Sequence, residues 1–464
     1  MSRLLLACLA LLPLAACSPG PDYVRPQVDV GSAFREAGRW QSTDGQAEAV
    51  NPTWWKVFAD PALDELEAQV EVGNQNLKAA EAQYRVALAA VQTARSSFFP
   101  TVTGSVSSTR GSAATGTVGG PAPVGTTDAL TLSASWEIDV WGRIRRNVES
   151  ARAGEEASAA DLAAARLSAQ ALLAQTYVQL RATDVQIDLY RRTVEAYTRF
   201  LELTRNRLAA GVASPLDVAQ AETQLGTAQT QAADLENQRA QLDHAIATLV
   251  GKLSAEHSVP PAARLPTLPP TPALVPSTVL VTRPDIAGAE RRVAAANARI
   301  GVAEAAWFPV LDLTGSAGYR GASFGGLLTA PHRFWSLGPA LALTLLDGGA
   351  RSAAVSSATA SYDQAVAEYR QAVLTAFQEV EDNLAAARLL DVEAQAQARA
   401  LAAASRSREI AENQYKAGVI NALNVVTAQT AELSATANSV SIASRRLQAA
   451  VQLFKNTGGA PAPR

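Results

Sequence analysis

Two copies of one plan follow each other along this sequence, and the repetition constrains the fold more than any other feature. The pair Phe99-Pro100 recurs as Phe308-Pro309, and the pair Gly211-Val212 recurs at almost the same spacing as Gly418-Val419. Two separate motifs that recur at nearly equal spacing indicate a tandem duplication. The stretch 259–276 between the copies is too rich in proline to form a helix. We therefore predict two structural repeats joined by a linker.

Each copy contains one helix that is far longer than a globular domain needs. These helices are predicted at 143–210 and 351–417, and at 1.5 Å per residue each would be about 100 Å long. Apolar residues follow a coiled-coil seam in the first helix and come closer to an 11-residue repeat in the second. Mixing these periods keeps helices nearly straight, so they could stand side by side as staves. A plain helical bundle or rod would account for the same helices.

Each copy is predicted to begin with one helix. A pair of strands then precedes each long helix, at 100–110 and 128–140 and again at 309–320 and 334–346. Along these runs apolar residues alternate with Ser, Thr, Asp or Gly, so that one face is apolar and the other polar. Each run has the roughly 10-residue length of a tilted membrane strand, with aromatic residues near its ends. A soluble two-stranded hairpin would show the same alternation.

Four strands per chain are too few to close a barrel, and an open edge in lipid leaves backbone groups unsatisfied. Two chains would supply about 8 strands, which form a barrel filled by its own side chains, whereas three supply about 12 and leave a lumen. We therefore predict a homotrimer.

The N-terminus indicates export and lipid attachment. Arg3 precedes a short apolar run, which is typical of a secretory signal, and residues 1–16 are predicted to be removed. Leu14-Ala15-Ala16-Cys17 resembles a bacterial lipoprotein processing site, so Cys17 is the predicted lipid attachment residue. Ser18 at the next position favours sorting to the outer membrane. An ordinary cleavage site beside an incidental cysteine is the alternative.

The composition argues against catalysis and against nucleic acid. A net charge of −3 gives no basic footprint for nucleic acid, and no segment after residue 17 is apolar enough for a transmembrane helix. The three histidines have no companions at ligand spacing, so we expect no metal and no cofactor. The stretch 321–325 matches the hydrolase G-x-S-x-G pattern at Ser323, but that motif needs a strand-to-helix elbow. We expect no catalytic residues.

Several characteristic stretches follow in order along the sequence, at 20–26 (GPDYVRP), 54–61 (WWKVFADP), 283–286 (RPDI) and 289–292 (AERR). With them, nearly the whole mature chain resembles the TolC-type outer-membrane factor family, in its NodT/OprM-type lipoprotein branch. The resemblance implies a mostly α-helical fold with membrane β-strands: a trimeric 12-stranded outer-membrane β-barrel, four strands per chain, continuous with a long periplasmic α-helical barrel.

The resemblance also implies a function. The chain would be the outer-membrane channel of a tripartite efflux system that exports small molecules, drugs or other toxic compounds. Its partners would be a periplasmic adaptor (membrane fusion protein), an inner-membrane pump of the RND type and outer-membrane lipid. The alternatives are a duct of a protein secretion system and a lipid-anchored periplasmic adaptor. An adaptor carries one helical hairpin, whereas this sequence has two in tandem.

Each long helix ends in a compact turn, at 211–215 and at 418–421. Glycine supplies the left-handed stop, Ser214 and Asn421 can cap the next helix, and Pro215 suits its first position. As local chemistry this makes two helical hairpins. By resemblance, the turns are periplasmic tips where the adaptor docks, and the docking residues are Gly211, Val212, Ala213, Ser214, Gly418, Val419, Ile420 and Asn421.

A periplasmic gate is expected just past the second tip. Family members often place there a Leu followed by an Asp and an Arg; in this chain the three positions are Leu423, Thr427 and Thr430. We therefore expect an apolar, hydrogen-bonded closure without an ionic lock, and only a weak dependence on salt. Asp217, past the first tip, could take over part of the missing charge.

The predicted organisation follows from these assignments. Its parts are the signal peptide 1–16, a lipid-anchored segment 17–59, the first repeat 60–255 with its second hairpin helix at 216–253, the linker 256–282, the second repeat 283–457 with its second hairpin helix at 422–457, and a flexible C-terminus 458–464.

Overall fold

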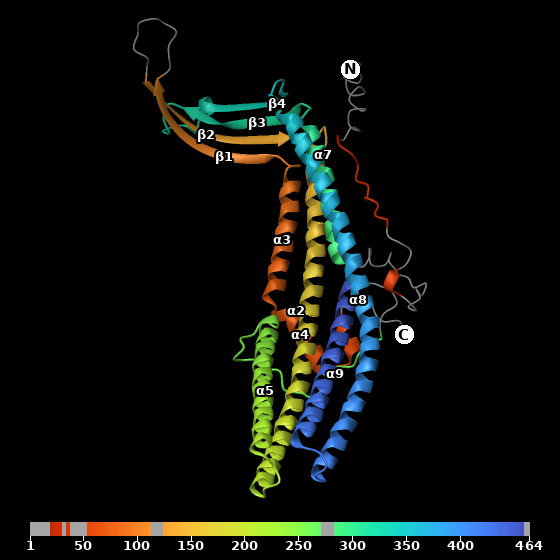
Figure 1. Cartoon of the computed structure of the whole chain (residues 1–464). Coiled ribbons are helices and arrows are strands. Elements are labelled where there is room, and N and C mark those ends of the chain that lie inside the picture. The colour runs from red at the N-terminus through yellow and green to blue at the C-terminus, as the bar shows by residue number, and fades with distance from the viewer. Residues whose placement is uncertain (1–18, 30–33, 38–52, 113–123, 271–282, 459–464) are drawn as a thin grey trace. The chain divides into compact units, whose positions relative to one another are not determined.

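The structure is a computed structural model, and it describes residues 19–29, 34–37, 53–112, 124–270 and 283–458 (Figure 1). It divides into two compact units. The strand unit comprises Met1–Gln27, Gln83–Ala159 and Gly288–Arg370, and the helix unit comprises Val28–Ala82, Ala160–Ala287 and Gln371–Arg464. The predicted signal peptide, Cys17, the second half of the linker and residues 459–464 lie outside the described residues.

The strand unit contains a four-stranded antiparallel sheet whose strands lie side by side in chain order (Figure 1). The strands are β1, β2, β3 and β4, with bounds Thr101–Ser112, Val124–Glu137, Val310–Gly321 and Arg333–Ala342. Because β2 pairs with β3, strands from both repeats join in one sheet. Among the described residues, β1 and β4 form its edges, and each leaves one row of backbone N–H and C=O groups unpaired. The four strands expected from the sequence are all present.

The register gives the sheet one polar and one apolar face. A single rung of the polar face runs through Thr103, Ser133, Ser316 and Ser336, and the hydroxyls of the last two are 2.8 Å apart. On the opposite face Trp335, Leu337 and Leu341 are 76%, 68% and 69% exposed. So large an apolar surface on one chain indicates a face that meets something other than water.

Two strand bounds differ from the prediction by four residues, and the others differ by three or fewer. β4 ends at Ala342 instead of 346, because Ala342 pairs with Val310, the first residue of β3, and the residues after it have no partner on that strand. β2 begins at Val124 instead of 128, because its pairing with β1 continues to Ser112. Both differences reflect cross-strand pairing, which alternation within one strand does not reveal.

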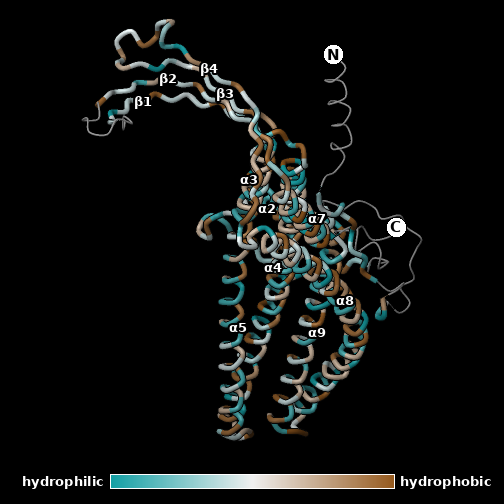
Figure 2. The backbone as a smooth tube through the Cα atoms, turned by 90° about the horizontal axis from the view of Figure 1, so that it is seen from above, coloured by the Kyte–Doolittle hydropathy of each residue, from teal (hydrophilic) through white to brown (hydrophobic). Residues whose placement is uncertain are grey.

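Corresponding helices of the two repeats have equal lengths. The long helices α4 (Arg143–Ala209) and α8 (Ala350–Lys416) each have 67 residues. Their hairpin partners α5 (Pro215–Leu249) and α9 (Ala422–Asn456) each have 35. Teal and brown alternate along these four helices in Figure 2. None of the helices described has an apolar stretch long enough to cross a membrane.

The helix that precedes the strands is single in the second repeat and broken in the first. The second repeat has α7 (Pro284–Ala305), whereas the first has α2 (Pro61–Gly73) and α3 (Gln75–Ser96), where we expected one helix. A Cβ on Gly73 would lie 2.0 Å from the carbonyl oxygen of Val250, so two backbones touch at the break. Asn74 then caps α3, because its side-chain oxygen accepts hydrogen bonds from backbone N–H groups in the first turn of α3.

Aromatic residues from both ends of the chain form the core of the helix unit. Trp54, in the short helix η3 (Trp54–Phe58), stacks on Phe454 of α9 with ring centroids 6.3 Å apart. Phe58 meets the same ring edge-on at 6.2 Å. The segment just before the first repeat and the end of the second repeat therefore share one apolar core.

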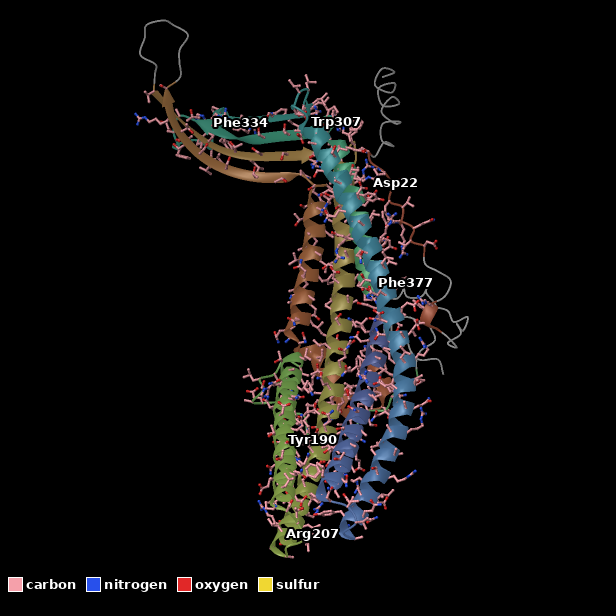
Figure 3. All side chains as sticks on the ribbon, viewed as in Figure 1. Asp22, Tyr190, Arg207, Trp307, Phe334 and Phe377 are labelled. Atoms are coloured by element: carbon pink, nitrogen blue, oxygen red, sulfur yellow. The ribbon has the colours of Figure 1, made fainter. Side chains whose placement is uncertain are left out.

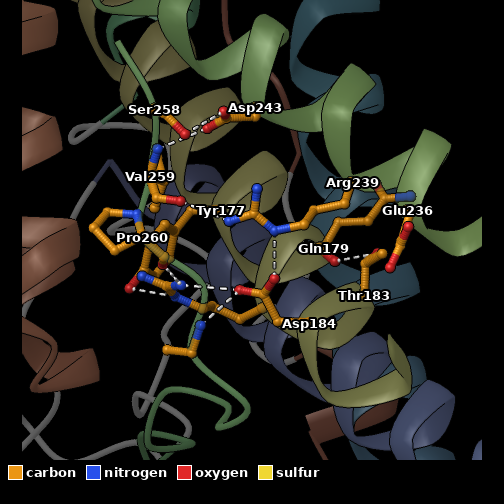
Figure 4. Close-up of polar contacts among 12 residues, drawn as sticks. Tyr177, Gln179, Thr183, Asp184, Glu236, Arg239, Asp243, Ser258, Val259 and Pro260 are labelled. Atoms are coloured by element: carbon orange, nitrogen blue, oxygen red, sulfur yellow. Dashed lines mark hydrogen bonds and ion pairs between the residues drawn. The ribbon is translucent and has the colours of Figure 1, made fainter. Parts of the chain in front are cut away.

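The described part of the linker is bound to the first hairpin by a buried polar network (Figure 4). Asp184 of α4 accepts from Arg181 at 3.0 Å and from Arg239 of α5 at 2.7 Å. The two guanidinium groups also donate to the carbonyl oxygens of Pro260 and Val259, at 2.7 and 2.6 Å. The proline-rich segment satisfies its backbone groups through these side chains, since it cannot do so in a helix.

Glu67 of α2 is a buried acid without a counter-ion. Its side chain is fully buried, and neither carboxylate oxygen has a hydrogen-bond partner among the described residues. Burial, together with the nearby Asp64, raises the pKa of the Glu67 carboxyl from 4.5 to about 9. Glu67 is therefore neutral in the folded protein at neutral pH, whereas it ionises in the unfolded chain.

Replacing Glu67 by glutamine should stabilise the protein increasingly as pH rises. Between pH 4.5 and about 9 the folded state keeps a proton that the unfolded chain releases, so the free energy of unfolding falls with rising pH. The Glu67→Gln variant loses this dependence, and its advantage should grow by up to about 1.4 kcal/mol per pH unit. Thermal unfolding at about pH 5 and about pH 8 measures the difference. Glu65→Gln, an exposed position on the same helix, is the control; an equal pH dependence in the Glu67→Gln protein and wild type would contradict this assignment.

Candidate functional site

Both hairpin turns use the same backbone motif. Gly211 and Gly418 adopt left-handed φ angles of +74° and +76°. In each turn, the glycine N–H and the N–H of the next residue donate to carbonyl oxygens in the last turn of the long helix, at 2.9–3.0 Å. This is the Schellman arrangement, and it needs a residue without a Cβ at the glycine position. The two turns belong to the same compact unit.

The second helix of each hairpin is capped as the sequence predicts. Ser214 and Asp217 form a reciprocal capping box at the start of α5, where Pro215 is the first residue. The Asp217 carboxylate accepts from the backbone N–H of Ser214 at 2.8 Å. In the second hairpin, the Asn421 side chain accepts from the backbone N–H of Asn424. Asp217 therefore already has a structural role at its own helix end.

The residues at the turns display apolar side chains. Val212 and Leu216 are 63% and 65% exposed at the first turn, and Val419 and Leu423 are 71% and 50% exposed at the second. Gly211, Ser214 and Asn421 are also exposed, whereas Ala213 is half-buried; the Ser214 hydroxyl is engaged in its cap. Two exposed apolar tips on one unit form a surface suited to binding another protein.

The predicted gate residues carry no charge pair. The Thr427 hydroxyl donates to the carbonyl oxygen of Leu423 at 2.8 Å, and the Thr430 hydroxyl donates to that of Val426 at the same distance. Thr430 also contacts the Gln224 side chain of the first hairpin at 3.5 Å. These are hydrogen bonds between neutral groups, as expected for a closure without an ionic lock. The gating role of these residues stays a prediction.

One contact between the hairpins was not predicted from the sequence. Arg207, near the end of α4 (Figure 3), lies over the ring of Tyr415 on α8 at 4.5 Å. Its guanidinium also donates to the Tyr415 carbonyl oxygen at 3.1 Å. Phe200 packs against the same ring with centroids 5.6 Å apart. Arg207 and Tyr415 lie just before the recurring Gly-Val pairs of the two turns, which marked the position but not the contact.

The loop between β3 and β4, which contains Ser323, does not form a nucleophile site. Ser323 follows β3 in a turn, and its hydroxyl donates to the carbonyl oxygen of Gly325 at 3.4 Å. The short helix η4 (Ala330–His332) leads into a strand, so the motif lacks the strand-to-helix elbow. Among the residues described, no group of His, Cys, Asp or Glu could hold a metal ion.

A family model described as "Outer membrane efflux protein" matches residues 66–252 and 275–459. The two matched segments correspond closely to the two repeats. The outer membrane protein OprJ of Pseudomonas aeruginosa is 32% identical over 468 residues, covering 98% of this chain and 95% of OprJ. The toluene efflux pump outer membrane protein TtgC of Pseudomonas putida is 30% identical, and the match covers 99% of this chain and 95% of TtgC.

Solved structures agree with these relatives. The outer-membrane channel OprN superposes with a TM-score of 0.87 at 30% identity, covering 96% of this chain and 99% of OprN. A likeness that extends over nearly the whole of both chains includes the sheet, the long helices and both turns.

Removing the Arg207 side chain should separate the two tips. The variant Arg207→Ala loses one cation–π contact and one hydrogen bond to Tyr415, together about 1–2 kcal/mol. Spin labels at Val212 and Val419 report the distance between the tips by pulsed electron paramagnetic resonance, with labelled chains diluted among unlabelled ones. In the variant this distance should lengthen and its distribution should broaden.

Arg205→Ala is the matched control, because Arg205 pairs with Glu222 within the first hairpin and does not reach the second. It should leave the distance distribution as in the wild type. If Arg207→Ala gives the same distribution as Arg205→Ala, the contact does not hold the tips together.

Proposed function

This chain belongs to the outer membrane efflux protein family and is the outer-membrane channel of a tripartite efflux system, and on that premise we propose which residues form the duct, dock its partner and close it. Channels of this family are trimeric and work with an adaptor and an inner-membrane pump. The chain's mostly helical fold with four antiparallel strands matches one third of a barrel. Small molecules are the proposed cargo, and an RND-type pump the proposed energy source.

The observation that carries this proposal is the sheet with two open edges and one uncovered apolar face. Three sheets joined through β1 and β4 would pair every edge and leave no unsatisfied backbone group in lipid. Trp335, Leu337 and Leu341 would then face the lipid. The opposite face, with its Ser and Thr residues and the charged Glu137, Asp312 and Arg320, would line the lumen.

We place adaptor docking at the two tips. Exposed Val212 and Val419 flank turns of nearly identical backbone, so a trimer would present six similar apolar ends. A repeated partner surface could engage each of them in the same way. The residues proposed to take part are those predicted from the sequence at 211–214 and 418–421.

The proposed gate is Leu423 with Thr427 and Thr430, steadied by the Arg207 contact with Tyr415. Leu423 is half exposed in one chain, so three copies could meet at the axis and exclude water. The hydrogen bonds of both threonines stay within their helix or reach Gln224. Asp217 is held in its cap, which leaves it little freedom to supply the missing charge.

We also propose that Cys17 carries the lipid anchor and that the chain catalyses no reaction. Relatives of the chain are named as efflux-pump outer membrane proteins, and their family is one of transport channels. Neither the protein-secretion duct nor the periplasmic adaptor has comparable support. The lipoprotein-like sequence before Ser18 remains the basis for the anchor.

The gate is tested by conductance of the purified trimer in planar bilayers at different salt concentrations. Raising salt from about 0.1 M to about 1 M shortens the Debye length from about 10 Å to about 3 Å and weakens exposed ion pairs. Wild-type open probability should change less than about two-fold, because its closure is neutral.

The double variant Thr427→Asp with Thr430→Arg restores the charged pair of other family members and should open steeply with salt. Either single variant supplies one charge only and serves as the control. A wild-type channel that opens as steeply as the double variant would contradict the neutral gate, and a preparation without conductance would contradict the channel itself.

A further inference from the structure

The first described residues are clamped onto two helices of the strand unit. Arg146 of α4 donates to the carbonyl oxygens of Pro19 and Gly20 at 3.3 and 3.2 Å and to the Asp22 carboxylate at 3.0 Å. Gly20 packs on Gly301 of α7 so closely that a Cβ on Gly20 would lie 2.5 Å from the Gly301 Cα. This segment is therefore packed against α4 and α7 in a defined position.

The clamp restricts where a lipid on Cys17 enters the membrane. Only two residue steps separate Cys17 from Pro19, and an extended chain spans at most about 3.6 Å per residue. An acyl anchor on Cys17 would thus start within about 7 Å of Pro19. The headgroup layer of the anchored leaflet must then lie beside the first turns of α4.

A cavity of about 400 Å³ opens beside this clamp, within the strand unit. Phe98 and Val148 supply apolar lining near the start of α4, and Tyr23 closes the side next to the clamp. Three arginines also line it: Arg145 and Arg152 of α4 and Arg291 of α7. Glu149 and Glu156 of α4 complete its polar lining, so the cavity combines an apolar wall with three arginines and two acids.

The three arginines differ in how far their charge is already matched. Arg145 pairs with Asp139, and Arg291 pairs with Glu290 and Glu156. Arg152 has no hydrogen bond or ion pair within the described part of the chain, although Glu149 and Glu156 lie one turn away on the same helix. Glu149 is instead engaged by Arg146. Of the three arginines, Arg152 is thus the one that forms no ion pair with a described residue.

The cavity lies mainly beside elements that adjoin the inner strands of the sheet. It is lined mainly by α4 and α7, which follow β2 and precede β3, the two inner strands of the sheet. Subunits would join through the outer strands β1 and β4. Because helical side chains lean toward the N-terminus of their helix, Arg152 extends toward the strand end of α4.

We propose that this cavity binds the phosphate headgroup of a glycerophospholipid in the leaflet that holds the acyl anchor. Arg152 and Arg145 bind the phosphate, while Phe98 and Val148 contact the glycerol and the first methylene groups. The lipid is favoured over a free phosphate by the apolar wall and by the anchor beside it. This inference rests on the proposed outer-membrane placement and on lipid attachment at Cys17.

The test is native mass spectrometry of the intact trimer with palmitoyl-oleoyl phosphatidylglycerol or phosphatidylethanolamine added in detergent. The wild-type trimer should retain lipid, and Arg152→Ala should retain about 5-fold less at equal lipid concentration. Arg299→Ala removes an exposed α7 arginine that does not line the cavity and should retain lipid like the wild type. Soluble sn-glycerol 3-phosphate should neither bind nor compete.

Each alternative result has one meaning. Equal retention by Arg152→Ala and the wild type, or an equal loss in Arg299→Ala, would overturn the site. Binding of glycerol phosphate as tight as that of the lipids would overturn the lipid as its occupant. Conductance of the same preparations separates this inference from the channel: conducting trimers that retain no lipid refute only the headgroup site.

Discussion

Unpaired backbone groups along β1 and β4 determine what the rest of this protein must do. A single chain leaves both edges of its sheet open and exposes Trp335, Leu337 and Leu341 on one face. In lipid, each unsatisfied N–H or C=O costs several kcal/mol, and in water the apolar face would promote aggregation. Pairing between copies of the chain removes both problems, so assembly and membrane insertion depend on the same edges.

The duplication explains why one sheet and two hairpins suffice for a duct. Each repeat contributes two strands and one hairpin, and the β2–β3 pairing joins the repeats within a chain. The two hairpins share lengths and turn geometry, yet they differ in chemistry just beyond the turns. Asp217 caps the first, whereas neutral Thr427 and Thr430 follow the second. Similar tips could thus dock one kind of partner, while the proposed gate residues follow only the second of them.

Features of the fold that depend on patterns within a few neighbouring residues were predictable from the sequence. Features that depend on contacts between distant segments were not. Alternation and helical periodicity located all four strands and both hairpins, because each pattern repeats within a few residues. The break at Gly73 was missed because it results from contact with the turn at Val250. Gly20 packs on Gly301, and Arg207 stacks on Tyr415. Each contact joins residues that are hundreds of positions apart in the sequence. Motifs marked those positions without revealing their partners.

The mass of the detergent-solubilised protein tests the central claim most directly. Native mass spectrometry or light scattering should find three copies of the 48.5 kDa chain, less the predicted signal peptide, with the β1 and β4 edges protected from hydrogen exchange. A folded monomer that stays soluble without detergent, with both edges exchanging freely, would contradict the account.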